Sequence, residues 1–211
     1  MTREQSVLDF YVLCNKLKDV VRTGWKNWNV KRERIESIAE HIYGTQMLAI
    51  AMWSEYKYDI DLSKVLSMLA IHELEETIIG DLTMFQIDKN EKEKIGHEAV
   101  EKILSNLLKG ETIKNLVFEF DKKETLESKF AYWCDKLECD LQCKLYDEQN
   151  CVDINSQDDN EIMFNPRVKE NLLREKTWSG MWLKYGQERY NYDENFLKVS
   201  QFAKENKLIK K

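Results

Sequence analysis

Apolar side chains recur every three or four residues along most of this 211-residue chain. That spacing places them on one face of an α-helix, because the helix completes a turn in about 3.6 residues. The pattern is longest in residues 125–148, where Leu126, Phe130, Trp133 and Leu137 mark an apolar face. The expected helices cover residues 6–21, 37–56, 61–80, 91–110, 111–120, 125–148, 166–185 and 192–207.

Local signals mark where some of these helices begin and end. Asp61 can cap the helix that follows it, and Gly80 is typical of a helix C-terminus. The stretch "RTGWKNWN" at residues 22–29 interrupts the helical pattern, so it is expected to be a loop carrying Arg22 and Trp25. Helices and short connections therefore account for most of the N-terminal half.

The chain shows no internal repeat and no linker rich in Pro, Gly or Ser. Residues 148–160 are polar, acidic and without periodicity, which predicts a mobile surface loop. With one proline and seven glycines, the chain lacks the turn residues that an all-β architecture needs. We expect an all-α fold in a single domain over residues 1–211, a compact bundle of about seven or eight helices.

Charge and cysteine content narrow the class of function. A net charge of −6 argues against binding to a nucleic-acid polymer, which needs a cationic face. No apolar run is long enough to span a membrane, and the N-terminus does not resemble a signal peptide. The five cysteines contain no CxxC pair, and Cys139 and Cys143 are expected to be buried thiols rather than metal ligands. The expected location is the cytoplasm.

The segment "IHELEETIIGD" at residues 71–81 combines apolar positions with a histidine and four acids. Burying a carboxylate among isoleucines and leucines costs several kcal/mol unless the carboxylate is paired or bound to a cation. A divalent ion would satisfy His72 and Glu73 from this segment, His41 from an earlier helix and Asp135 from a later one. Such mixed nitrogen and oxygen ligands suit Mn, Fe, Co, Ni or Zn.

In their order along the chain, these residues resemble the HD-domain metal-dependent phosphohydrolases, whose pattern is H…HD…D on successive helices. The pattern here lies in "AEHIYG", "IHELEETIIGDL" and "CDKLECDL". The subfamily that contains the 5′-deoxynucleotidases is the most similar, through "RTGWKNWNV", "RIESIAEH", "HELEETIIGDL" and "CDKLE". The resemblance covers residues 20 to 145 and implies the HD-domain helical bundle.

The resemblance also implies a role for each matching residue. It implies hydrolysis of the 5′-phosphate of (deoxy)nucleoside monophosphates by water that one divalent transition metal ion activates. The implied metal ligands are His41, His72, Glu73 and Asp135; Glu76 and Asp81 lie on the reactive side; and Arg22, Trp25 and Arg34 contact phosphate or nucleoside.

One residue departs from the family pattern, because Glu73 stands where the family has aspartate. The extra methylene can alter coordination geometry, so a weakly active or inactive nucleotide-binding regulatory protein is the alternative to an enzyme. A purely structural helical protein is a third possibility, and it would bind no metal.

A purely structural role is the alternative for several residues. His97 is expected at the surface or near a helix start, and Glu75 as a solvated charge or a salt-bridge partner. Arg22 and Arg34 can be solvent-facing, and Trp25 can simply cover the core. The C-terminal aromatic residues are expected in core packing or a dimer interface, and we expect a homodimer. These residues are Trp178, Trp182, Tyr185, Tyr190, Tyr192 and Phe196.

Overall fold

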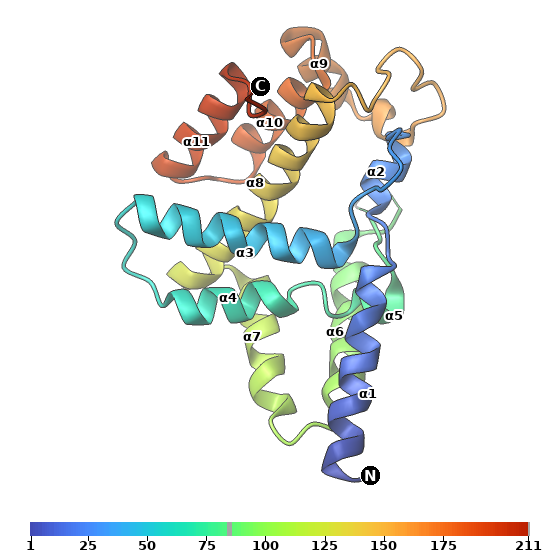
Figure 1. Cartoon of the computed structure of the whole chain (residues 1–211), viewed down its shortest axis with the longest axis vertical. Coiled ribbons are helices and arrows are strands. Elements are labelled where there is room, and N and C mark those ends of the chain that lie inside the picture. Colours follow the sequence, from blue (N-terminus) through green and yellow to red (C-terminus); the bar gives the residue numbers. More distant parts are fainter. Residues whose placement is uncertain (84–85, 211) are drawn as a thin grey trace. The chain divides into compact units, whose positions relative to one another are not determined.

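The computed structural model describes residues 1–83 and 86–210, and over these residues the only extended pairing is an isolated bridge between Val21 and Ser37. The rest of the regular structure is helical (Figure 1), which confirms the all-α prediction. The helices are α1 (Arg3–Asn15), η1 (Lys16–Lys18), α2 (Thr23–Asn27), α3 (Ile38–Glu55), α4 (Leu62–Ile71), α5 (Glu76–Ile79), α6 (Lys89–Leu104), α7 (Gly110–Lys122), α8 (Leu126–Glu148), η2 (Glu161–Phe164), α9 (Pro166–Glu175), α10 (Trp178–Arg189) and α11 (Glu194–Glu205).

The chain divides into two compact units. The first holds Met1–Thr23 with Glu36–Tyr132, and the second holds Gly24–Ile35 with Trp133–Lys211. Helix α8 is unbroken through the boundary, so both units contain part of it. That residues 1–211 form a single domain stays a prediction.

In the first unit, the start of α3 is firmly fixed. Ser37 is its N-cap, and Ser37 and Glu40 form a reciprocal capping box. The preceding strand-like segment is tied to it, because Arg22 N–H donates to the Glu36 carbonyl at 3.1 Å and Ile38 N–H donates to the Val20 carbonyl at 2.9 Å. The predicted start near Ser37 is confirmed, and Arg22 is thereby held close to the first turn of α3.

The prediction of one helix over residues 61–80 is wrong in its second half. Asp61 caps α4 as expected, but α4 ends at Ile71, a turn covers residues 72–75, and α5 resumes at Glu76. Within the turn, Leu74 N–H donates to the Ile71 carbonyl and Glu76 N–H donates to the Glu73 carbonyl, which is the tighter three-residue pattern. The apolar positions continue through the turn, so periodicity alone could not reveal it.

Other helix boundaries also differ from the predictions. The first helix ends at Asn15 rather than at residue 21, and α6 ends at Leu104, six residues before Gly110. The expected helix over 166–185 is two helices, because Lys176 adopts a left-handed conformation with φ of 60° between α9 and α10. The eleven α-helices of the described residues therefore exceed the seven or eight expected.

The "RTGWKNWN" stretch is not the predicted loop, because α2 forms there. Asp81 supplies the missing cap, since its Oδ2 accepts a hydrogen bond from Thr23 N–H at 2.6 Å. A partner 58 residues away is invisible to local sequence signals.

In the second unit, aromatic side chains form the core. Trp25 packs edge-on to Tyr146 and Trp178, with ring centroids 5.3 Å and 6.0 Å apart. Four of the C-terminal aromatic residues are buried, which favours core packing for them: Trp178, Tyr185, Tyr192 and Phe196. Cys143 is buried as expected, whereas Cys139 is only half-buried.

Residues 148–160 lack helix after Glu148, as expected, but they are not purely a surface loop. Cys151, Gln157 and Asn160 are buried. The Gln157 amide donates to the Trp28 carbonyl at 3.2 Å, and Lys31 N–H donates to the Cys151 carbonyl at 2.7 Å. Among the described residues, the helices are too short or too polar for one of them to cross a membrane.

Candidate metal centre and phosphohydrolase site

Two histidines of the first unit lie side by side at the centre of the site, with their rings tilted by 54°. His41 is in the first turns of α3 and is fully buried, while His72 is the C-cap residue of α4. Their ring centroids are 5.5 Å apart. The break between α4 and α5 matters here, because it brings His72 and Glu73 to the end of a helix rather than the middle of one.

The protonation of the His72 ring is set by its backbone partner. Its Nδ1 lies 2.8 Å from the Leu69 carbonyl oxygen, which can only accept a hydrogen bond, so Nδ1 carries the proton. In the neutral ring, Nε2 then holds the lone pair, and this nitrogen lies 3.7 Å from Oε1 of Glu73. A backbone carbonyl that fixes the tautomer in this way is typical of a metal-binding histidine.

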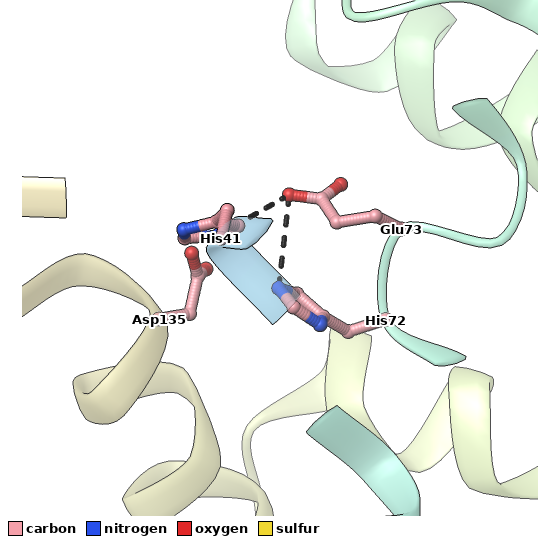
Figure 2. A group of neighbouring side chains, drawn as sticks. All are labelled: His41, His72, Glu73 and Asp135. Atoms are coloured by element: carbon pink, nitrogen blue, oxygen red, sulfur yellow. Dashed lines mark ion pairs between the residues drawn. The ribbon is translucent and has the colours of Figure 1, made fainter. Parts of the chain in front are cut away.

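The Glu73 carboxylate is turned toward both imidazoles (Figure 2). Its Oε1 lies 3.9 Å from Nε2 of His41 and 3.4 Å from a guanidinium nitrogen of Arg22. The glutamate side chain therefore reaches the position where its oxygen can share a cation with the two histidines. The family's aspartate is not required for that reach.

Asp135 completes a four-residue group. It is buried on α8, and its Oδ2 also pairs with Lys136 at 2.8 Å. One nitrogen or oxygen atom from each of His41, His72, Glu73 and Asp135 lies within 4.8 Å of the others. Two imidazole nitrogens and two carboxylate oxygens form a donor set that suits a divalent transition metal. These residues fit the metal that the sequence resemblance implies.

Sequence reasoning missed a second group around His41. Glu36 and Glu138 are buried, and each offers an oxygen that lies within 4.8 Å of the other and of a His41 nitrogen. Glu36 immediately precedes the N-cap of α3, and Glu138 lies one helical turn beyond Asp135. The sequence offered one signal for Glu138, its spacing of one helical turn from the proposed ligand Asp135.

Glu76 begins α5 and is buried beside Glu73. Burial, followed by the charges of Glu73 and Asp81, raises the pKa of Glu76 well above its ordinary value. Its Oε1 accepts a hydrogen bond from the Lys92 ammonium at 3.3 Å, whereas its Oε2 is buried and has no hydrogen-bond partner among the described residues. One oxygen is thus anchored by Lys92, and the other is a buried acceptor that a bound water molecule would satisfy.

The prediction that Glu75 is a solvated charge is wrong. Its Oε2 is buried without a hydrogen-bond partner in the described part of the chain, and its Cγ lies 3.4 Å from the position a side-chain carbon would take at Gly96. Burial, then repulsion from Glu73, raises the pKa of Glu75 to about 8. Glu75 is buried because helix α6 packs over it. The sequence around Glu75 does not predict this contact.

Asp81 and Arg22 are joined through Thr23. The side chain of Asp81 accepts a hydrogen bond from Thr23 N–H. The backbone carbonyl of Asp81 accepts a second one, at 2.7 Å, from the Thr23 hydroxyl. Asp81 therefore positions the backbone next to Arg22, whose guanidinium faces Glu73. A catalytic role for Asp81 stays a prediction.

The other two predicted substrate contacts belong to the second unit. Trp25 is 4% exposed and packs in the aromatic core, which agrees with the simpler role of covering the core. Arg34 is exposed. Their contacts with substrate stay predictions.

His97 lies outside the metal group. It is half-buried on α6, its Nε2 is 2.8 Å from Asp121 Oδ2, and its ring lies 4.1 Å from that of Phe118. Its partners belong to α6 and α7, so His97 provides a histidine control for experiments on the metal group.

A comparison with protein-family models shows which family the chain belongs to. The family model described as "HD domain" matches residues 14–174. The chain belongs to the HD domain family. The 5′-deoxynucleotidase HDDC2 of Dictyostelium discoideum is 34% identical over 151 residues, which cover 67% of this chain and 78% of that protein. The 5′-deoxynucleotidase hdd1 of Schizosaccharomyces pombe is 30% identical over 151 residues, covering 68% and 74%.

A solved structure shares the HD-domain fold. The PH0347 protein of Pyrococcus horikoshii OT3 matches with a TM-score of 0.66 over 94% of this chain and 98% of that one, at 19% identity. The family match extends across Arg22, the two histidines of the metal group, Asp81 and Asp135.

Proposed function

We propose that this HD-domain protein hydrolyses the 5′-phosphate of deoxynucleoside monophosphates with the aid of one divalent transition metal ion. The group of His41, His72, Glu73 and Asp135 is the observation that carries the proposal. The names of the 30–34% identical relatives supply the substrate class. The native metal is one of Mn, Co, Fe, Ni and Zn, which share this ligand preference.

The four residues would hold the ion, which when bound supplies the acidity that deprotonates water near neutral pH. Oε2 of Glu76, a buried oxygen without a hydrogen-bond partner among the described residues, would accept the proton of the attacking water from the ionised carboxylate, the form that the Lys92 ammonium favours. As the bond from phosphorus to the 5′-oxygen breaks, the same carboxyl returns the proton to that oxygen. Atoms and charge then balance: water adds to phosphorus, and the nucleoside leaves with its 5′-hydroxyl.

The phosphate itself needs cations. Arg22 presents its guanidinium beside Glu73, and a guanidinium offers paired donors that match phosphate oxygens. Arg34 is proposed as a second phosphate contact and Trp25 as a nucleoside contact. Asp81 acts by keeping Thr23, and with it Arg22, in place.

A metal-dependent substrate screen tests this function. Metal-stripped protein is expected to release phosphate from 5′-deoxynucleotides after one of the five metals is added, and to leave the matching 3′-phosphates intact. The measurement is free phosphate against time. Hydrolysis of 3′- and 5′-phosphates at equal rates would contradict the assignment of the substrate class.

We also infer a homodimer, formed through one face of α3. No charged residue lies between Glu40 and Glu55 except the buried His41, yet the helix exposes large apolar side chains. They are Tyr43 at 64% exposed, Met47 at 41%, Ile50 at 38% and Trp53 at 43%. Aromatic residues and Met without charges are typical of an interface core.

A second copy of the chain fits this face. If two α3 helices cross antiparallel at Met47, the large Tyr43 meets Ala51 of the other copy and Ile50 meets Gly44. Each pair then occurs twice, as a two-fold interface requires. A stable interface needs about 800 Å² per partner, and α1 in the same unit exposes further apolar side chains. These are Val7, Leu8, Tyr11 and Val12.

Placing a charge on this face is expected to produce monomers. Met47→Glu should lower the mass measured by light scattering from that of two chains to that of one, because two carboxylates would meet at the crossing point. Leu108→Glu changes an 86% exposed residue elsewhere and should leave the mass unchanged. A wild-type protein with the mass of one chain would refute the dimer. We place the enzyme in the cytoplasm, where thiols such as the buried Cys134 and Cys143 stay reduced.

A further inference from the structure

Lys92 reaches into the site from a helix that carries no metal ligand. It lies in the first turns of α6, and its ammonium donates to Glu76 Oε1 at 3.3 Å and to the Leu82 carbonyl at 2.7 Å. A cation near a helix N-terminus is electrostatically unfavourable, because that end of the helix dipole is positive. The contacts with Glu76 and Leu82 offset this cost.

Lys92 is surrounded by acids of the site. Burial alone would lower its pKa, but the carboxylates of Glu73 and Glu76, with those of Glu75 and Asp81, outweigh burial and raise it. Lys92 is therefore a cation near neutral pH. Its ammonium lies 3.3 Å from Oε1 of the buried Glu76.

One contact of Lys92 gives the two oxygens of the Glu76 carboxylate different environments. Oε1 receives the ammonium, and Oε2 has no hydrogen-bond partner among the residues the structure describes. Glu76 is 2% exposed, so Oε2 is a buried acceptor that a bound water molecule would satisfy.

The other contact holds the backbone that follows α5. Gly80 turns the chain with φ of 74°, and Asp81 then binds Thr23 beside Arg22. Leu82, whose carbonyl accepts the second hydrogen bond from Lys92, directly follows Asp81. Lys92 therefore connects Glu76 with the segment that positions Arg22.

We propose that Lys92 is a positioning residue of the phosphohydrolase site, which sets the orientation of Glu76 and holds residues 80–83 against α6. The expected effect of Lys92 on catalysis rests on the proposed function. Its contacts with Glu76 and Leu82 do not depend on that function. A misplacement of about 1 Å in a catalytic group can cost about 10²-fold in rate.

The test compares Lys92→Met with Lys92→Arg and with the control Lys94→Met, which removes an exposed lysine of the same helix. Lys92→Met is expected to lower kcat for dAMP by about 10²-fold while metal affinity changes by less than about threefold. Lys92→Arg should restore at least about a tenth of kcat, since it returns a cationic donor. Lys94→Met should match the wild type.

Amide hydrogen exchange gives a second readout that needs no activity. Residues 80–83 should exchange faster in Lys92→Met than in Lys94→Met, while α4 exchanges at the same rate in both. An active wild type with unchanged kcat and unchanged exchange in Lys92→Met would overturn the proposal. If the wild type releases no phosphate, the proposed function fails. In that case, faster exchange at residues 80–83 in Lys92→Met still supports the role of Lys92 in holding this segment, and unchanged exchange refutes it. Should Lys92→Met not fold, Lys92→Gln removes the charge with less loss of polarity and takes its place.

Discussion

Replacing His72 with alanine is expected to abolish metal binding and phosphate release together. The Leu69 carbonyl fixes the tautomer that points the lone pair of His72 toward the metal group, and the alanine variant lacks that nitrogen. Because the loss of an outer-shell partner already weakens metal affinity by about 10–100-fold, the loss of a ligand should weaken it by more than about 10²-fold. Metal content after gel filtration and kcat/KM for dAMP measure the two effects.

The control for this prediction is His97→Ala. His97 pairs with Asp121 outside the metal group, so its loss should leave metal content and kcat within about twofold of the wild type. His72 also packs against Phe120, with ring centroids 5.2 Å apart, so thermal unfolding must show that His72→Ala still folds. A folded His72→Ala protein that keeps its metal would contradict the ligand assignment.

Replacing Glu76 with glutamine should have the second largest effect, and it should separate catalysis from metal binding. Glutamine keeps the size of the side chain but cannot accept a proton from water at Oε2. General acid–base catalysis contributes about 10²–10⁴-fold, so kcat should fall by that factor. Metal content should stay near one ion per chain, because Glu76 is not among the four ligands.

An exposed acid of α6 provides the matched control. Glu98→Gln removes a carboxylate at the surface and should leave kcat unchanged. If Glu76→Gln retains wild-type kcat, the proton acceptor lies elsewhere, and Asp81 becomes the next carboxylate to replace. If it loses its metal instead, the carboxylate serves the ion rather than the proton transfer.

The metal group could be predicted from the sequence because each proposed ligand lies in a short motif, and a carboxylate such as Asp135 within an apolar helix face demands a partner. The resemblance of these motifs, in their order, to the HD-domain pattern indicated which residues converge, and the structure brings those four close together. Helix class and the start of α3 follow from equally local signals, the apolar spacing and the Ser37 capping box.

The parts that escaped prediction depend on contacts between distant residues. Trp25 stands in a polar stretch but is buried by Tyr146 and Trp178. Asp81 accepts a hydrogen bond from the first N–H of α2 across 58 residues, and Lys92 donates to Glu76 from 16 residues away without a periodic signal. Such pairs are set by packing rather than by propensity.

Glu73 is the residue on which the enzyme and regulatory readings differ. Its longer side chain still brings Oε1 to 3.7 Å from His72 Nε2 and 3.9 Å from His41 Nε2. The oxygen therefore remains close enough to both nitrogens to share a cation with them, which the enzyme reading requires.

The most direct test of the metal-dependent phosphohydrolase is a titration of the metal-stripped wild-type protein with single divalent metals, followed by phosphate release from dAMP. We predict that release rises with metal and saturates near one ion per chain, and that folded His72→Ala stays at the background rate. No release with any of the five metals, or equal release by the wild type and His72→Ala, would contradict the account.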